Sequence, residues 1–223
     1  MRRIPEPELM IEEEQVRAYA GADFAEPHDH LIALLREKLD DLPETGIALD
    51  LGCGAGDISR RFANALPGWR VHGIDGSPTM LRIAGDMTAA AGLADRVTFE
   101  EVLLPAAPPD GVRYDLVFSN SLLHHLADPD VFWSAVRDWA GPGGRVFVMD
   151  LLRPPTREVA EEFVRLYAAD EPALLQTDFF NSLRAAFEEP EITAQLERAG
   201  LGQLQVEVVS DRHCIAWGTM STP

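Results

Sequence analysis

Cysteine is nearly absent from this chain, whose 223 residues include only Cys53 and Cys214. Two cysteines so far apart in sequence provide neither a disulfide framework nor a zinc knuckle by themselves. The histidines and cysteines show no metal-ligand spacing, and Asp128, Asp130 and Asp150 are scattered along the chain. We therefore predict that the protein has no metal site.

Positive charge is also scarce. The chain has 19 Lys and Arg residues against 37 Asp and Glu residues, which gives a formal net charge of −18. Nucleic acids and anionic membranes bind basic surfaces, so this balance disfavours both as partners. No apolar run approaches the roughly 18 residues that a membrane span needs, and no secretory signal is visible. We expect a soluble, cytoplasmic protein.

The apolar residues that are present, 46% of the chain, are enough for one substantial core. Short apolar segments alternate with amphipathic ones, which is typical of βαβ units and of a mostly parallel sheet with helices on both faces. The predicted strands are 47–51, 70–74, 97–102, 114–119 and 145–151, the predicted helices are 57–66, 78–91 and 130–140, and a glycine turn is predicted at 141–144.

The pattern differs at the two ends of the chain. The first 45 residues are predicted to be helical with a break at 25–27. Further helices are predicted at 156–169, 179–187 and 191–199, and a hairpin at 204–209 and 214–217. We predict one domain with an N-terminal helical cover (1–45), a ligand-binding core (46–153), a helical insertion (154–189) and a last helix with the hairpin (190–223). Late insertions of this kind are usually lids or binding elements.

A glycine-rich loop follows the first predicted strand and reads Asp50-Leu51-Gly52-Cys53-Gly54-Ala55-Gly56. Glycines allow a tight turn and a close approach of the backbone to a ligand, and the next helix offers free N–H groups. The fingerprint of nicotinamide dinucleotides requires G-x-G-x-x-G. Here the third glycine comes one place early and Asp57 follows it, so the loop suits a ligand without phosphates.

A carboxylate, Asp75, ends the second predicted strand, 19 residues beyond Gly56. In doubly wound sheets an acid at this place reaches the ribose hydroxyls of a bound nucleoside, and a carboxylate accepts from two hydroxyls. A solvated acid at a strand end is the alternative. The glycine loop at the right distance favours the ribose role.

Four ordered motifs together resemble the class I S-adenosylmethionine-dependent methyltransferases of the small-molecule type. They are ALDLGCGAGD, HGIDGSPTML, YDLVFSNSLLHHL and GPGGRVFVMD, within residues 45–153. The resemblance implies a doubly wound, seven-stranded, mostly parallel sheet of the Rossmann-like methyltransferase type, ending in an antiparallel hairpin. It also implies S-adenosylmethionine as the cofactor and S-adenosylhomocysteine as its product.

The resemblance implies roles for particular residues. The methionine part of the cofactor would lie against Asp50 and the loop of Gly52, Cys53, Gly54 and Gly56. The ribose would bind Asp75, the adenine would lie against Gly76, Ser77 and Met80, and Ser119 and Asn120 would lie beside the sulfonium. The family often has an acid after the third strand that binds the adenine amino group. Here apolar residues follow Glu100 and Glu101, so a neighbouring Glu or backbone groups would substitute.

The candidate catalytic residues are Tyr19, His124 and Arg153. In similar enzymes the N-terminal region that carries Tyr19 closes over the cofactor, but an amphipathic surface helix is the alternative. A histidine at 124 or 125 would act as a general base, or both would simply pack after the fourth strand. Adjacent residues diverge, so we expect one of the two to face the pocket. Arg153 would bind an anionic or carbonyl-bearing acceptor, or pair with one of the many acids.

We expect methyl transfer to a small molecule by in-line displacement. Three alternatives stay open. One is methylation of a macromolecule such as tRNA, the second is a fold relative that binds S-adenosylmethionine without methylating, and the third is a module that senses the cofactor. The sequence names neither the acceptor atom nor the oligomeric state.

Overall fold

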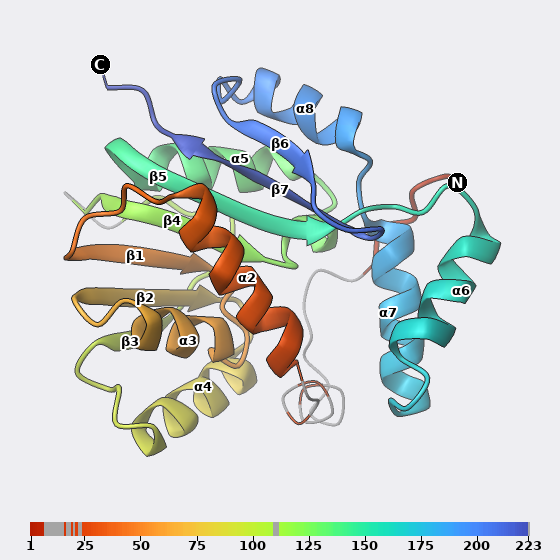
Figure 1. Cartoon of the computed structure of the whole chain (residues 1–223), viewed down its shortest axis with the longest axis horizontal. Helices are drawn as coiled ribbons and strands as arrows, with labels where there is room; N and C mark the ends of the chain where they lie inside the picture. Colours follow the sequence, from red (N-terminus) through yellow and green to blue (C-terminus); the bar gives the residue numbers. More distant parts are fainter. Residues whose placement is uncertain (7–15, 17–18, 20, 22–23, 109–111, 223) are drawn as a thin grey trace.

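A computed structural model describes residues 1–6, 16, 19, 21, 24–108 and 112–222 of the chain. Much of the helical stretch that we predicted before residue 25 therefore lies outside the described residues. Within them the chain alternates strands and helices along the central sheet shown in Figure 1.

The sheet has seven strands in the order β3-β2-β1-β4-β5-β7-β6. All neighbouring pairs through β5 are parallel, whereas β7 is antiparallel to both β5 and β6. This confirms the predicted mostly parallel sheet with an antiparallel C-terminal hairpin. The strands are β1 (Gly46–Leu51), β2 (Trp69–Asp75), β3 (Val97–Glu101), β4 (Tyr114–Asn120), β5 (Ala140–Leu151), β6 (Gln205–Val208) and β7 (His213–Thr219).

Helices cover both faces of this sheet (Figure 1). Buried residues of α2 and α3 form one core with β1, β4 and β5, and buried residues of α5 and α8 form the other. A third, smaller cluster joins α6 and α7 beyond the end of β5. The helices are α2 (Ala25–Lys38), α3 (Asp57–Ala65), α4 (Pro78–Ala90), α5 (Pro129–Trp139), α6 (Arg157–Tyr167), α7 (Ala173–Ala185) and α8 (Glu189–Arg198).

Three predicted boundaries are wrong. The expected break at 25–27 is instead the first turn of α2. The N–H groups of the first turn have no partner within the helix, so a proline is tolerated there. The expected turn at 141–144 lies within β5, because Tyr114 pairs with Ala140 and Leu116 pairs with Arg145, which leaves the glycine-rich residues as a bulge. Helix α7 begins at Ala173, directly after a proline, and not at Phe179.

Parallel pairing places the two candidate binding segments at the same edge of the sheet. Leu51 at the end of β1 lies opposite Ile74 of β2. The glycine loop and Asp75 therefore both leave the carboxyl ends of adjacent central strands, where open α/β sheets bind ligands.

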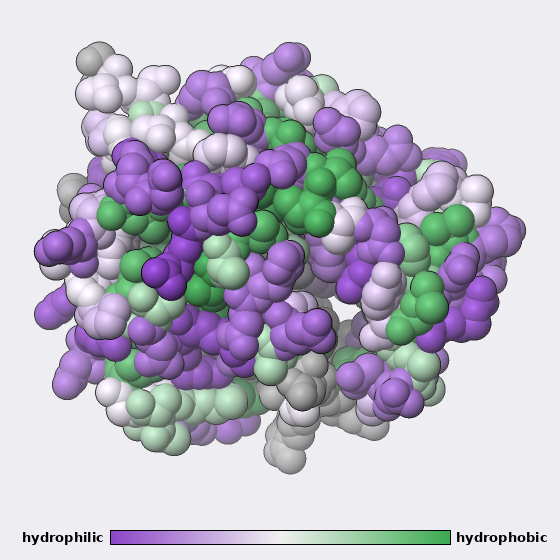
Figure 2. All heavy atoms as spheres, viewed as in Figure 1, coloured by the Kyte–Doolittle hydropathy of each residue, from purple (hydrophilic) through white to green (hydrophobic). Residues whose placement is uncertain are grey.

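The surface is mainly polar. Purple, hydrophilic residues cover most of the face seen in Figure 2, with smaller green patches between them. Among the described residues, no helix combines the length and apolarity required to cross a bilayer.

Candidate functional site

A cavity of about 900 Å³ opens at the carboxyl ends of the central strands. This volume is at the upper end of the range of about 300–1,000 Å³ for small-molecule sites. Most predicted site residues line it, namely Tyr19, Asp50, Gly52, Cys53, Gly54, Asp75, Gly76, Ser77, Met80, Asn120 and His124. Gly56, Ser119 and Arg153 do not.

The glycine loop turns through left-handed backbone conformations. Gly52, Gly54 and Gly56 all have positive φ, between 51° and 76°. A side chain at Gly56 would approach the Phe99 ring to 2.7 Å, so this glycine is needed for packing at the start of α3. A side chain at Gly54 would meet nothing within 4 Å. The loop backbone at Gly54 is therefore open to a ligand.

Asp75 is held in place by the backbone on both of its oxygens. Its Oδ2 accepts from Gly54 N at 2.9 Å, and its Oδ1 accepts from Ser77 N at 2.8 Å. Burial raises the pKa of this carboxyl above its ordinary value, while these N–H groups oppose the shift. The Gly76 N–H also bonds to this carboxyl. The two oxygens have four lone pairs in all, so acceptor capacity remains for a ligand.

Asp50 lies beneath the loop and is nearly inaccessible, with 2% of its surface exposed. It accepts a hydrogen bond from Ser59 Oγ of α3. Burial raises its pKa to about 7, and the Asp75 charge adds to the shift while the Ser59 bond opposes it. Burial also raises the pKa of the Cys53 thiol, so this cysteine stays protonated and is a poor nucleophile.

The segment after β2 begins α4. Ser77 caps this helix by accepting from Met80 N at 3.4 Å, with Pro78 at the first helical position. Ser119 of β4 points away from the cavity, because its Oγ donates to Leu51 O of β1 at 2.6 Å. Its role is to join two strands, whereas the next residue, Asn120, lines the cavity.

The wall after β3 is apolar. Val102, Leu103 and Leu104 line the cavity. Glu100 lies 3.2 Å from His72 and is not a lining residue, and neither is Glu101. Among the described residues of this segment, no acid lines the cavity where the family often has one for the adenine amino group. Of the two alternatives given above, a contact through backbone groups is the one that this wall leaves open.

An aromatic row forms the rim near Asp75. The Tyr19 and Phe24 ring centroids are 5.0 Å apart, and those of Phe24 and His28 are 5.4 Å apart. Burial raises the pKa of Tyr19 to about 12, with further contributions from the charges of Asp75 and Asp57. This phenol is protonated at neutral pH and lies near the cofactor end of the predicted site.

His124 is almost fully buried at the opposite end of the cavity. Its Nδ1 lies 2.5 Å from Asp150 Oδ1. Burial opposes a charge on the ring, but Asp150 raises the pKa of His124 above its ordinary value. Both His124 and His125 line the cavity, so the expectation that only one does is wrong. The short 3₁₀ turn at Leu123–His125 leaves the two ring centroids 4.3 Å apart.

No local pattern predicts the N-terminal residues that meet this histidine pair. Arg3 donates from Nη2 to the carbonyl oxygens of His124 and Leu126, at 3.1 and 2.8 Å. Glu6 Oε1 accepts from Ser182 Oγ of α7 at 2.9 Å. Residues 1–6 therefore cross from α7 to the turn after β4, a contact between distant parts of the chain that no local pattern predicts.

Arg153 lies apart from the other candidates. Its Nη2 is 2.9 Å from Glu188 Oε1 and 3.0 Å from Glu191 Oε1, and its Nη1 donates to Ala186 O. A guanidinium that is buried and paired in this way is not available to an acceptor in the cavity. The structure supports the alternative that we gave for Arg153, an arginine paired with acids, and the catalytic assignment is corrected accordingly.

Comparison with known proteins agrees with this geometry. A family described as a methyltransferase domain matches residues 49–146, which run from β1 into β5. The ubiquinone biosynthesis O-methyltransferase of Cereibacter sphaeroides is 32% identical over 121 residues, which cover 54% of this chain and 47% of that protein. Residues 49–146, somewhat less than half of the chain, are thus similar to a methyltransferase domain.

Other relatives extend the comparison. The ribosomal protein L11 methyltransferase of Vibrio cholerae is 31% identical over 161 residues, which cover 72% of this chain and 51% of that protein. The chain spans about half the length of the curated relatives that it matches.

Solved structures share the fold at low sequence identity. A SAM-dependent methyltransferase from Aquifex aeolicus superposes with a TM-score of 0.69 at 16% identity, covering 95% of this chain and 100% of that one. The plantazolicin methyltransferase BpumL, in complex with a pentazolic desmethylPZN analog and SAH, gives 0.72 at 12% identity, covering 93% and 90%. These neighbours confirm the Rossmann-like methyltransferase fold.

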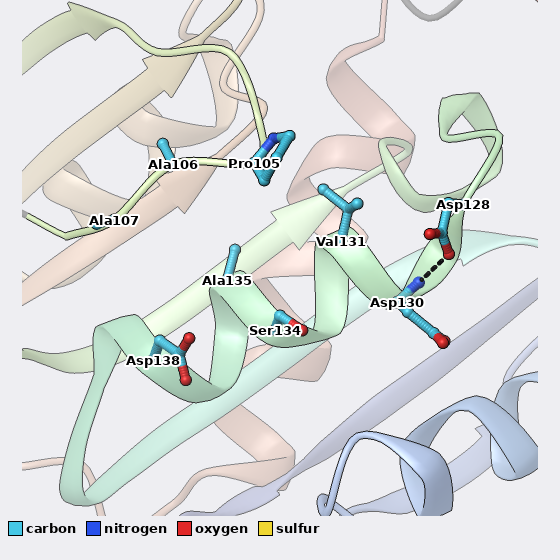
Figure 3. Close-up of a pocket in the computed structure, with 9 residues that line it drawn as sticks. All are labelled: Pro105, Ala106, Ala107, Asp128, Asp130, Val131, Ser134, Ala135 and Asp138. Carbon is cyan, nitrogen blue, oxygen red and sulfur yellow. Dashed lines mark hydrogen bonds between the residues drawn. The ribbon is translucent and has the colours of Figure 1, made fainter.

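A second hollow lies between residues 105–107 and α5 (Figure 3). Asp128, Asp130, Ser134 and Asp138 provide its polar atoms, and one Asp128 oxygen already accepts from Asp130 N at 3.0 Å. None of its lining residues borders the larger cavity. The candidate site is therefore the cavity at the sheet edge.

Proposed function

We propose that this protein transfers a methyl group from S-adenosylmethionine to a small-molecule acceptor. The observation that carries the proposal is the pairing of Asp75 with the glycine loop. The Gly54 N–H fixes Asp75 Oδ2 beside the open backbone of the loop. A carboxylate and a bare backbone at the end of adjacent parallel strands suit a nucleoside ribose.

The residues of the cavity fit such a cofactor. Asp75 keeps acceptor capacity for a ribose hydroxyl beside its backbone bonds. Part of the cavity wall is apolar and consists of Met80, Val102, Leu103 and Leu104. Such a wall suits the flat face of a base. Asp57 follows the loop and would repel a pyrophosphate, which favours a nucleoside without phosphates over a dinucleotide.

When bound, the cofactor supplies a methyl group that its sulfonium already activates. The protein then has to bind both reactants, align them and exclude water. Tyr19 and Phe24 at the rim are proposed to cover the cofactor. His124, Leu175 and Phe179 are proposed to enclose the acceptor, since they line the cavity on the side of the 3₁₀ turn and α7.

A small-molecule acceptor is proposed because the cavity is walled by several elements and the chain is strongly acidic. The similarity to O-methyltransferases of ubiquinone biosynthesis supports an acceptor with a hydroxyl group. The similarity to ribosomal protein L11 methyltransferases supports a protein acceptor as a second candidate. The cytoplasmic location remains a prediction.

One experiment separates these candidates. The purified protein is incubated with methyl-labelled S-adenosylmethionine and either a metabolite extract or a protein and RNA extract of the source cells. Label is expected in a small molecule, together with S-adenosylhomocysteine. Label in a protein or an RNA would replace the small-molecule proposal with its alternative.

A cofactor that binds only the folded chain must raise its melting temperature. If S-adenosylhomocysteine produces no shift at millimolar concentration, the whole proposal fails. If it binds but no label is transferred, the chain is a fold relative that binds the cofactor without methylating.

A further inference from the structure

Three side chains from distant parts of the sequence meet at the His124 end of the cavity. Glu6 Oε1 lies 3.5 Å from His124 Nε2 and 3.3 Å from His125 Nδ1. One ligand atom from each residue lies within 4.8 Å of the other two. Two imidazole nitrogens and a carboxylate oxygen are a donor set that divalent transition metals bind.

The separations suit tetrahedral coordination. Zinc bonds to nitrogen and oxygen are about 2.0–2.2 Å long, and a tetrahedral angle then places two ligand atoms about 3.3–3.6 Å apart. Both distances from Glu6 fall in this interval. Both also exceed the usual N–H···O separation of about 2.7–3.2 Å. The two separations between Glu6 and the histidines are therefore compatible with an ion bound between these atoms.

The surrounding residues hold these ligands in position. Asp150 lies against Nδ1 of His124 and so turns Nε2 toward Glu6. Asp150 is itself fixed by the N–H groups of Leu123 and Leu151, both at 2.7 Å. Ser182 Oγ donates to Glu6 Oε1. A carboxylate behind a ligating histidine is the usual second partner in metal sites, where it fixes the tautomer and the ring orientation.

Charge at this end of the cavity also favours a cation. Glu6 and Asp150 lie in the cluster, and Asp178 is close enough to Glu6 to influence its ionisation. Arg3 is an opposing positive charge, and its guanidinium donates to the carbonyl oxygens of His124, Leu126 and Ala185 and not to the three proposed ligand atoms. The His124 side chain is 2% exposed and that of Glu6 is 11% exposed, so an ion bound here would be shielded from bulk water.

We propose that Glu6, His124 and His125 bind one Zn²⁺ or a similar divalent transition-metal ion, with Asp150 and Ser182 orienting the ligands. Both histidines line the cavity, so an ion held by them would lie at the wall of that cavity. The proposal departs from the expectation that the sequence contains no metal site, because Glu6 lies 118 residues before His124. It does not depend on methyl transfer.

Binding is tested with untagged, chelator-treated protein titrated with zinc chloride by calorimetry, followed by metal analysis after desalting. We expect one zinc per chain, and with Co²⁺ the visible absorption bands of tetrahedral coordination. Glu6→Gln and His125→Ala should each weaken zinc binding by at least about tenfold. Circular dichroism checks that both variants fold, and His125 is partly exposed, which favours an intact variant.

A matched control comes from a second pair of the same residue types. His72 Nε2 lies 3.2 Å from Glu100 Oε2, but the described residues there include no second histidine ligand. Glu100→Gln should bind zinc as the unmodified chain does. The proposal is overturned if the folded chain binds no zinc, or if Glu6→Gln and Glu100→Gln bind it equally well. Titration of the same samples with S-adenosylhomocysteine tests the cofactor separately, so the two proposals fail independently.

Discussion

His28 Nδ1 lies 2.7 Å from Asp57 Oδ2, and this contact joins α2 to the first residue of α3 at the rim of the cavity. Burial raises the pKa of Asp57, but hydrogen bonds from His28 and Arg61 outweigh it and hold the pKa well below its usual range. This contact links α2, which lies at the rim of the cavity, to α3, which follows the glycine loop. A change at one end of this contact should affect both.

Replacing Asp57 by Asn should destabilise the protein. A depressed pKa in the folded state means that the charged carboxylate contributes stability above the unfolded pKa of about 3.9, and that this contribution decreases as the pH falls below that value. The side chain is 37% exposed, so we expect a loss of only about 1 kcal/mol at pH 8. Urea unfolding measures it. Asp29→Asn, at an exposed partner of Arg61, should change little, and an equal loss there would contradict the assignment.

Asp50→Asn should have the opposite effect, and one that depends on pH. The folded pKa of about 7 lies above the unfolded value of about 3.9. The folded state therefore binds the proton more tightly, and stability falls as the pH rises from about 3.9 to about 7 and then levels off. The neutral amide avoids this loss and should be more stable at pH 8.5 by roughly 2–4 kcal/mol, with a smaller gain at pH 5.5. Urea curves at both values test this. A gain of the same size at both would refute the role of ionisation.

Asp75→Asn should weaken binding of S-adenosylhomocysteine by roughly 1.5–3 kcal/mol, the usual value for hydrogen bonds to a charged group. The amide keeps the shape of the carboxylate but loses one acceptor oxygen. Calorimetry gives the affinity. Asp115→Asn is the control, since that carboxylate also accepts a backbone N–H, from Ile47, at the opposite end of β1. Unchanged affinity in a folded Asp75→Asn protein would exclude the ribose contact.

Ser121 has a φ of 55°, which is unusual for a residue other than glycine. It follows Asn120 in the cavity wall, and such backbone strain often occurs at functional sites. Ser121→Gly should leave stability unchanged or raise it by up to about 1 kcal/mol, whereas Ser121→Val should lower it by more than about 1 kcal/mol. Thermal unfolding of both variants compares them. If valine is tolerated as well as glycine, the position is not strained.

Arg153→Met should lower the melting temperature without changing cofactor affinity. The substitution leaves Glu188 and Glu191 without their cation and the Ala186 carbonyl without a donor. Both glutamates are more than 40% exposed, so the expected loss is about 1–3 kcal/mol, less than for a fully buried pair. Calorimetric unfolding gives the melting temperature of the variant, and titration with S-adenosylhomocysteine gives its cofactor affinity. Turnover lost in a fully folded variant would restore the acceptor role.

The sequence predicts the central sheet because its signals are local. Glycines end β1, Ser77 and Pro78 start α4, and apolar runs mark the parallel strands. Asp75 can be predicted as a site residue from the sequence because one βαβ unit sets its distance from the glycine loop. These are the parts of the site in which neighbours in sequence are also neighbours in space.

The missed features depend on contacts between distant segments. The bulge in β5 is fixed by its register with Tyr114, and Glu6 reaches His125 across more than 100 residues. Arg153 is a charged residue at the correct edge of the sheet, yet two glutamates of the α8 region bind it. Charge and position along the chain do not distinguish an arginine that binds a ligand from one that stabilises a helix terminus.

The backbone hydrogen bonds to Asp75 affect how tightly the site binds a ligand. Because the Gly54 and Ser77 N–H groups fix both carboxylate oxygens, the side chain has given up its rotational freedom before any ligand arrives. Immobilising a free side chain on binding costs roughly 0.5–1.5 kcal/mol, and here that loss belongs to folding instead. The site is preorganised, and a variant that loosens either backbone bond should bind with a less favourable entropy even though Asp75 itself is unchanged.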